Sequence, residues 1–165
     1  MNNIYQKEAK IQNINILLIE DNPGDAKLVE IYLKDATSIN FQLKHAVRLS
    51  EGMQIAQQNP EFDIVLLDLS LPDSRGFQTL TKAMQGFPKQ ISIVVLTGLD
   101  DESLGMKAVE MGAQDYLVKG QIDTSSLTRS VLHAIQRQRM QIQVEETARN
   151  LRTSEDRLLQ AQNIA

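Results

Sequence analysis

"ILLIEDNPGDAKLVE", residues 16–30, joins a short apolar run, an acidic pair and a turn. The apolar run predicts a buried strand, and the Asn-Pro-Gly turn leads into a segment whose apolar residues recur at intervals of three and four, as in a helix. Between the two stand Glu20 and Asp21. Like charges at close range repel, and burial makes each carboxylate costlier to ionise, so this pair needs a compensating partner.

The same alternation of strand and helix repeats along the chain. Apolar runs predict strands at residues 14–19, 41–46, 62–67, 91–96 and 114–118. Amphipathic stretches between them predict helices at residues 25–36, 50–59, 76–86 and 100–112. Short connections between alternating strands and helices imply parallel strands, right-handed crossovers and helices on both faces. The sequence therefore predicts a doubly wound α/β domain with a five-stranded parallel sheet, in which strand 41–46 lies at an edge.

After this domain the chain reads as one long helix. Asp123 or Thr124 can cap it, and neither Pro nor a further strand signal follows. Three apolar residues then recur at intervals of seven, namely Val144, Leu151 and Leu158. Such spacing is typical of a coiled coil, so a homodimer through this helix is one expectation for residues 139–165.

Composition excludes several classes of function. The net charge of −4 and the sequence pI of about 5.2 leave no basic field for nucleic acid or an anionic membrane. The absence of cysteine excludes a disulfide framework, a zinc ribbon and thiol catalysis. No secretion signal and no membrane-spanning apolar run are present, so a cytoplasmic protein is expected.

Residues with charged or hydroxyl side chains follow four of the predicted strands, at the end of the sheet where doubly wound domains bind their ligands. Glu20 and Asp21 follow the first strand and Asp68 the third, while Thr97 and Lys119 follow the fourth and fifth. Three converging carboxylates favour a hard divalent cation with oxygen ligands, of which Mg²⁺ is the natural candidate. A carboxylate, a metal, a lysine and a hydroxyl together predict a phosphoryl acceptor site.

Taken in order, these motifs resemble the receiver domain of two-component response regulators, over residues 14–138. The resemblance lies in "LLIEDN", in "DIVLLDLSLPDSRG", in "VVLTG" and in "GAQDYLVK", which occur in the family's order and at its spacings. It implies a flavodoxin-like fold, preceded by a lead-in of residues 1–13. The final "LRTSEDRLLQAQNIA" resembles a linker that leads into a PAS domain, which would make residues 139–165 a signalling linker to a C-terminal effector.

The resemblance also implies a role for each motif residue. Asp68 would accept a phosphoryl group from a histidine kinase or a histidine phosphotransfer protein. Asp21, Asp68 and the backbone carbonyl of Ser70 would bind Mg²⁺, with Glu20 acting largely through water. Contact with the phosphoryl group and the conformational switch would involve Lys119, Thr97 and Tyr116, and small Gly98 would leave the acceptor accessible.

Two positions depart from the family pattern. Gly120 stands where the family usually has a proline preceded by a cis peptide, and a cis bond before a residue other than proline is costly, so the Lys119-Gly120 bond is expected to be trans, or cis under strain. Ser70 stands at a position that influences dephosphorylation in the family.

Other interpretations remain open. Individually, Asp68 could cap a helix, Thr97 could be a turn residue and Tyr116 could belong to the core. As a whole, the chain could be a stand-alone receiver that binds a partner when phosphorylated, or a metal-dependent phosphohydrolase that uses the same carboxylates. His45 has no partner at metal-binding spacing, and the neighbours of His133 do not resemble those of a kinase's phosphorylated histidine, so His133 is expected on a helix surface.

Overall fold

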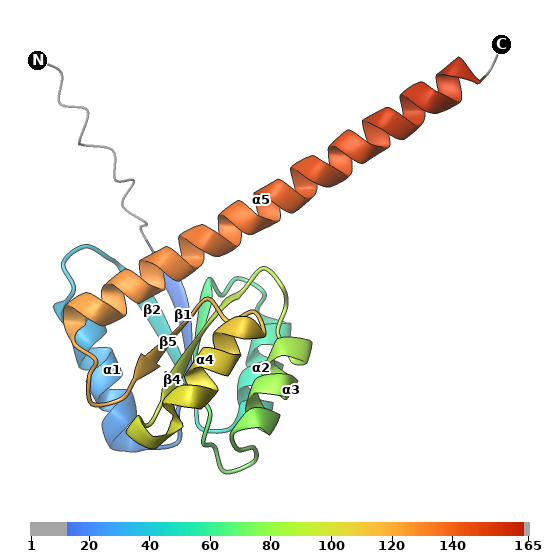
Figure 1. The fold of residues 1–165 in the computed structure, drawn as a ribbon. Coiled ribbons are helices and arrows are strands. Elements are labelled where there is room, and N and C mark those ends of the chain that lie inside the picture. Colours follow the sequence, from blue (N-terminus) through green and yellow to red (C-terminus); the bar gives the residue numbers. More distant parts are fainter. Residues whose placement is uncertain (1–12, 164–165) are drawn as a thin grey trace, which may run out of the picture.

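The computed structural model describes residues 13–163, so the predicted lead-in falls almost wholly outside the described part of the chain. Five parallel strands form one sheet in the order β2-β1-β3-β4-β5, which confirms the predicted fold class and the edge position of β2 (Figure 1). The strands are β1 (Ile14–Ile19), β2 (Phe41–Ala46), β3 (Ile64–Asp68), β4 (Ser92–Thr97) and β5 (Asp115–Val118).

Helices cover both faces of this sheet (Figure 1). One face packs against α1 (Pro23–Asp35) and the first part of α5 (Thr124–Gln162). The opposite face packs against α2 (Leu49–Gln58), α3 (Phe77–Gly86) and α4 (Glu102–Glu110), and a short 3₁₀ turn, η1 (Leu99–Asp101), precedes α4. Each face therefore has its own apolar layer, as the near-continuous apolar runs of a parallel sheet require.

The central strands are more deeply buried than the edges. Every residue of β3 and β4 is buried, and β1 is buried at all but one position, whereas β2 is exposed or half-buried at every position except Ala46. Strand ends differ slightly from those predicted, because Asp68 pairs with Leu96 and Thr97 with Val118 in the ladder. Asp68 and Thr97 are thus the last residues of their strands, which fixes their backbone by sheet hydrogen bonds.

α5 begins at a capping box and leaves the domain as a single long helix. The Asp123 carboxylate accepts a hydrogen bond from the Ser126 N–H at 2.7 Å, and the Asp123 N–H donates to Ser126 Oγ at 3.0 Å. Leu127, Val131 and Ile135 are buried against the sheet. Gln141 Oε1 still accepts a hydrogen bond from Gln114 at 3.0 Å, and the rest of the helix projects away from the domain (Figure 1). None of the helices in residues 13–163 is both long enough and apolar enough to cross a membrane.

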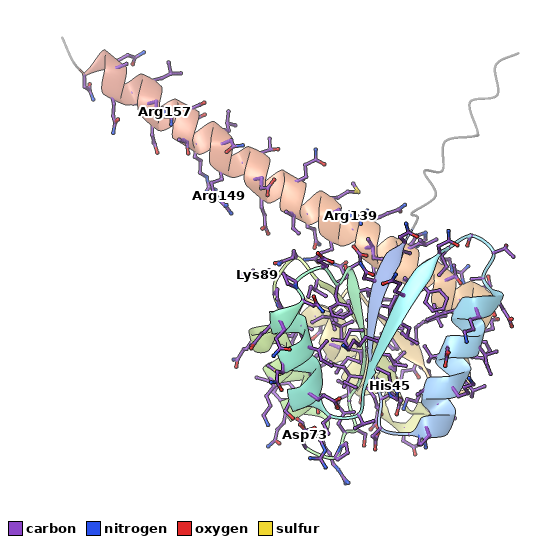
Figure 2. All side chains as sticks on the ribbon, turned by 180° about the vertical axis from the view of Figure 1, so that it is seen from behind. His45, Asp73, Lys89, Arg139, Arg149 and Arg157 are labelled. Atoms are coloured by element: carbon purple, nitrogen blue, oxygen red, sulfur yellow. The ribbon has the colours of Figure 1, made fainter. Side chains whose placement is uncertain are left out.

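The loop between β3 and α3 is fastened to the start of α2. Arg48, at the N-cap of α2, makes no capping bond with its side chain, but the Asp73 carboxylate accepts hydrogen bonds from the N–H groups of Leu49 and Ser50, each at 3.0 Å. Figure 2 shows Asp73 at the end of the domain opposite to Arg139. A residue distant in sequence therefore caps α2 and holds a loop that begins next to Asp68.

Replacing Asp73 by alanine should lower the free energy of unfolding by about 1 kcal/mol, because two N–H groups of α2 lose their acceptor. Partial burial opposes ionisation, but the Ser50 and Leu49 N–H groups outweigh it and hold the pKa of Asp73 below its ordinary value. The difference between wild type and Asp73→Ala should therefore be complete at neutral pH and fade as the pH falls through that lowered pKa.

Urea denaturation at a series of pH values measures this difference. Glu146→Ala, which removes an exposed carboxylate from the projecting part of α5, is the matched control and should change little. An Asp73→Ala effect that is independent of pH would contradict the capping role.

Candidate functional site

Three carboxylates meet at the carboxyl ends of β1 and the adjacent β3. The strand order reverses here, because β2 lies on one side of β1 and β3 lies on the other. Glu20 and Asp21 follow β1, and Asp68 ends the adjacent β3. One oxygen from each lies within 4.8 Å of the other two. Glu20 and Asp68 are buried, whereas Asp21 is exposed. The structure thus brings together the three predicted acidic residues at the edge where doubly wound folds bind ligands.

Lys119 compensates the charge of this cluster. Its Nζ lies 2.5 Å from Glu20 Oε2, 3.0 Å from Asp68 Oδ2 and 3.2 Å from Asp25 Oδ2. The Lys119 N–H also donates to the Thr97 carbonyl at 2.7 Å, which holds the end of β5 against β4. This ammonium answers the question raised by the acidic pair: within the described residues, a half-buried cation lies between the carboxylates.

The departure at Gly120 has not removed the lysine from the site. No cis peptide occurs in residues 13–163, so the Lys119-Gly120 bond is trans. Gly120 has φ +86°, a left-handed conformation that residues with a Cβ rarely adopt. The turn after β5 therefore places Lys119 with a trans peptide and a glycine.

Burial sets the protonation of Glu20. Desolvation raises the pKa of this carboxyl to about 8, Lys119 opposes the shift, and the nearby Asp68 adds to it. Burial alone would lower the pKa of Lys119, but Glu20 and Asp68 raise it above its ordinary value. The ammonium therefore stays charged, while Glu20 holds its proton more firmly than an exposed glutamate does.

Two buried oxygens in the site lack hydrogen-bond partners among the described residues. One is Glu20 Oε2, which is close to Lys119 Nζ without hydrogen-bond geometry, and the other is Thr97 Oγ1. Buried polar atoms are normally satisfied, so such atoms indicate a place where a ligand, ion or water binds. Next to Thr97, a Cβ built on Gly98 would meet just one atom at 3.8 Å, an oxygen of Asp101, so this side of the site is open.

Tyr116 lies on β5, between the sheet and α4. Its ring packs against Gly105, where an added Cβ would come within 2.5 Å of the ring. Its hydroxyl donates to Glu102 Oε1 at 3.4 Å. The tyrosine is thus partly a core residue, as one interpretation of the sequence held, with a polar end that reaches the start of α4.

The loop that carries Ser70 is ordered by its own hydrogen bonds. The Ser70 N–H donates to Asp68 Oδ1 at 3.0 Å, and the Gly76 N–H donates to the Leu69 carbonyl at 2.7 Å. An isolated antiparallel β-bridge pairs the backbones of Ser70 and Arg75 and closes the loop. Asp68 is therefore held at both oxygens, by Ser70 on one side and Lys119 on the other.

Sequence reasoning missed two residues that contact this site. Asp25, in the first turn of α1, was interpreted only as part of an amphipathic helix, yet its carboxylate accepts a hydrogen bond from Lys119. His45 Nε2 lies 2.6 Å from the Glu20 carbonyl, which can only accept, so this nitrogen is the donor. No periodicity or spacing signals these contacts, because they join different strands and helices.

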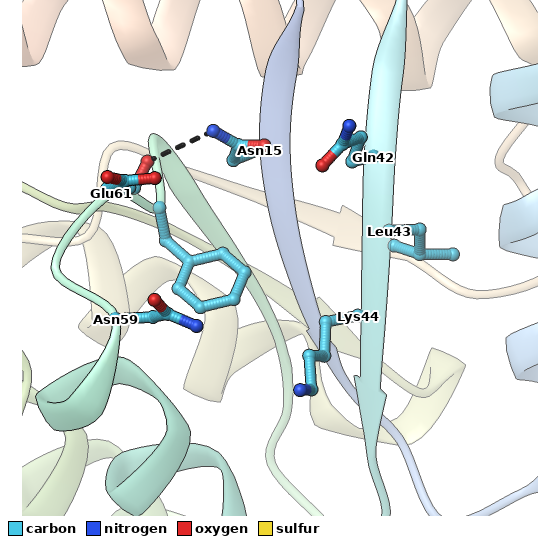
Figure 3. A pocket seen from close by; sticks show the side chains of 7 residues that line it. Asn15, Gln42, Leu43, Lys44, Asn59 and Glu61 are labelled. Atoms are coloured by element: carbon cyan, nitrogen blue, oxygen red, sulfur yellow. Dashed lines mark hydrogen bonds between the residues drawn. The ribbon is translucent and has the colours of Figure 1, made fainter.

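The site itself has little enclosed volume. A hollow of about 60 Å³ beside it is lined by Glu20, Asp25 and Lys119 together with apolar residues of α1. A larger hollow, of about 220 Å³, lies beside the edge strand β2, where its lining includes Gln42, Lys44 and Phe62 (Figure 3). This second hollow does not include any of the predicted site residues.

Comparison with known protein families identifies the family of this chain. Residues 16–132 match the response regulator receiver domain, and the chain belongs to this family. "Probable transcriptional regulatory protein SilR" of Salmonella typhimurium is 34% identical over 106 residues, which are 64% of this chain and 44% of that protein. "Transcriptional regulatory protein SrrA" of Staphylococcus aureus is 33% identical over 63% of this chain and 41% of its own length. The match thus spans less than half of either relative.

Solved structures agree with this assignment. A receiver domain from Clostridium thermocellum has a TM-score of 0.66 at 24% identity and covers 77% of this chain and 98% of its own. The response regulator Rcp1, solved in a Mn(2+)-bound form, has a TM-score of 0.58 at 30% identity and covers 72% of this chain and 89% of its own. The fold and the family are therefore established.

Replacing Lys119 by methionine should lower the free energy of unfolding by about 3 kcal/mol in metal-free buffer, because it leaves buried carboxylates without their cation. The loss should be larger at about pH 9 than at about pH 6, since Glu20 keeps its proton below its raised pKa and then needs Lys119 less.

Chemical denaturation at the two pH values measures this loss, with Lys82→Met, on the exposed side of α3, as the control. An equal loss at both pH values would show that Lys119 does not neutralise Glu20.

Proposed function

We propose that this receiver domain takes a phosphoryl group from a phosphohistidine onto Asp68 and passes the resulting state to an effector. The observation that carries the proposal is the position of Asp68 Oδ2, 3.0 Å from Lys119 Nζ, in a cluster with two further carboxylates. A carboxylate so placed can act as a nucleophile whose product carries its new charge next to a fixed cation.

The donor set of the site fits Mg²⁺. Asp21, Asp68 and the Ser70 carbonyl would hold the ion, with Glu20 acting largely through water. All are oxygen ligands, and one oxygen each of Glu20, Asp21 and Asp68 lies within 4.8 Å of the other two, which supports a shared cation. Rcp1, a structural relative, is described in a Mn(2+)-bound form. When bound, the ion would neutralise charge on the transferring phosphoryl oxygens.

The residues of this chain have separate parts in the transfer. An Asp68 oxygen attacks phosphorus, the new O–P bond forms as the P–N bond breaks, and the imidazole nitrogen leaves with the electron pair. Lys119 moves from neutralising Asp68 to contacting the phosphoryl oxygens. Thr97 Oγ1, which has no partner in residues 13–163, donates to one of these oxygens. Gly98 keeps the approach open.

Phosphorylation would then act as a switch. The added charge and acceptor oxygens favour a position of Thr97 closer to the acceptor, and Tyr116 changes rotamer in step. The tyrosine hydroxyl bonds to Glu102 at 3.4 Å, a distance at the weak end of the range, which supports a movable ring. Glu102 begins α4, so the change would reach the surface formed by α4, β5 and α5.

Residues 14–138 would form the receiver unit and residues 139–165 a signalling linker. In the described residues, the last hydrogen bond of α5 to the domain joins Gln141 to Gln114, just after the contacts of Gln138 with Lys89 and of Arg139 with Asp63. A stand-alone receiver that binds a partner is the second candidate, favoured by exposed Met106 on α4. A phosphohydrolase is disfavoured, because the 60 Å³ hollow is far smaller than an ordinary substrate pocket.

Acetyl phosphate with Mg²⁺ should add one phosphoryl group to the wild type, seen by intact-mass spectrometry, and none to Asp68→Asn. EDTA should abolish the gain, because the metal site would be empty. A phosphorylated Asp68→Asn variant would contradict the acceptor assignment. Circular dichroism of Asp68→Asn is the control for an intact fold.

The projecting part of α5 supports a homodimer as a further part of the proposal. Val144, Leu151 and Leu158 are 67%, 61% and 65% exposed, which leaves a stripe of large apolar side chains without cover. A second copy of the same helix offers the matching heptad stripe and would bury both. Histidine kinases or phosphotransfer proteins remain the proposed phosphodonors.

Replacing both Leu151 and Leu158 by lysine in the full chain should abolish a dimer measured by sedimentation equilibrium, because both substitutions place charges in the shared seam. The matched control, Thr153→Lys with Gln160→Lys, adds the same charge elsewhere on the helix and should leave the dimer unchanged. A dimer that survives in the leucine variant would show that the contact lies elsewhere.

A further inference from the structure

Asp25 is a fourth carboxylate at the acceptor site, and it lies outside the cluster that could hold a metal. Its Oδ2 accepts a hydrogen bond from Lys119 Nζ at 3.2 Å, from the side of α1. The metal-holding group of the described residues comprises Glu20, Asp21 and Asp68 alone. Lys119 therefore contacts two kinds of carboxylate: Glu20 and Asp68, which belong to the cluster that could hold a cation, and Asp25, which does not.

The position of Asp25 is fixed by the turn that follows β1. Its backbone N–H donates to Asn22 Oδ1 at 3.0 Å, which makes Asn22 the cap of α1. The N–H of the same Asn22 donates to Glu20 Oε1 at 3.0 Å. One turn thus sets both Glu20 and Asp25 around the ammonium, with the Asp25 backbone held in the first turn of a helix.

Lys119 would need such a partner when a cation occupies the cluster, because among the described residues its ammonium contacts only carboxylates. Its backbone is held by the bond to Thr97, but the lysine stem has four rotatable bonds. The next residue, Gly120, has φ +86°, and a Cβ built there would find no atom within 4 Å. A cation bound at the cluster of Glu20, Asp21 and Asp68 would compete with Lys119 for the carboxylate oxygens. Asp25 would then be its remaining carboxylate partner.

We infer that Asp25 is a positioning residue that holds the Lys119 ammonium beside Asp68 when a divalent cation occupies the site; this inference rests on the proposed phosphoacceptor function. Asp25 would not touch the metal or the phosphoryl group. It would limit the stem of Lys119 to the conformations that reach the transferred group, and misplacement of such a group lowers rates steeply.

An alternative reading of the same carboxylate makes the opposite prediction. Asp25 lies in the first turn of α1, where any acid interacts favourably with the helix dipole. In that case its loss would alter stability and leave the phosphorylation rate unchanged. A purely repulsive effect of its charge on an anionic donor would instead make the rate rise when the charge is removed.

The test compares phosphorylation by acetyl phosphate at saturating Mg²⁺ in the wild type, Asp25→Ala and Asp25→Asn. The rate should fall about tenfold in Asp25→Ala and recover largely in Asp25→Asn, whose amide oxygen still accepts from Lys119. Mg²⁺ affinity, measured by titration, should be unchanged in both. Asp35→Ala, at the exposed end of α1, is the matched control. Unchanged or faster phosphorylation of Asp25→Ala would overturn the inference.

A double-mutant cycle shows whether Asp25 acts through the lysine. In a Lys119→Met background, Asp25→Ala should cause no further loss of rate, because the group that it positions is gone. Independent, multiplicative losses would contradict the inference. Thermal unfolding of each variant separates these rates from changes in stability.

A second readout does not depend on phosphorylation. In ¹H–¹⁵N spectra that detect lysine ammonium groups, the Lys119 signal, assigned by its loss in Lys119→Met, should persist in Mg²⁺-saturated wild type and broaden in Asp25→Ala. A signal unaffected by Asp25→Ala would refute the positioning role. A wild type that shows this pattern but accepts no phosphoryl group would refute the proposed function and leave the positioning role supported.

Discussion

The ion pair between Lys119 and the buried carboxylates is the contact on which the site depends. Glu20 is fully buried beside Asp68, an arrangement that is unfavourable for two anions, and the ammonium at 2.5 Å and 3.0 Å compensates it. Because Lys119 follows β5, while Glu20 follows β1 and Asp68 ends β3, the ion pair links the central strands to the edge of the sheet. A cation or phosphoryl group that enters the site must therefore rearrange this link, which makes the site sensitive to its occupant.

The site and the exit of α5 lie at opposite ends of the sheet. The carboxylates stand at the carboxyl ends of the strands, while Gln138 and Arg139 contact Lys89 and Asp63, which precede β4 and β3. Figure 2 shows Lys89 and Arg139 together at one end of the domain, well away from Asp73. Under the proposed function, a signal from Asp68 would have to cross the domain, and the proposed rotamer change of Tyr116, which packs against Gly105 of α4, would be one route.

Two carboxylates connect the first turn of a helix to a distant segment near Asp68. Asp73 caps α2 from the loop that begins after Asp68, and Asp25 stands in the first turn of α1 and reaches Lys119. In both cases a local helix-capping preference is combined with a contact between segments far apart in sequence. The loop after Asp68 and the ammonium beside it are thus both tied to the first turns of helices.

The sequence by itself determined the alternation of strands and helices, the parallel sheet and the end of the sheet at which Glu20, Asp21, Asp68, Thr97 and Lys119 gather. Hydrophobic periodicity is a local property, and strand order in doubly wound folds follows from few rules, so these features could be predicted. Tertiary structure alone decided that Asp25 and His45 contact the site, that the bond after Lys119 is trans and that Asp73 caps α2. Each of these depends on distances between separate elements and on side-chain conformations, for which a linear pattern of residues carries no signal.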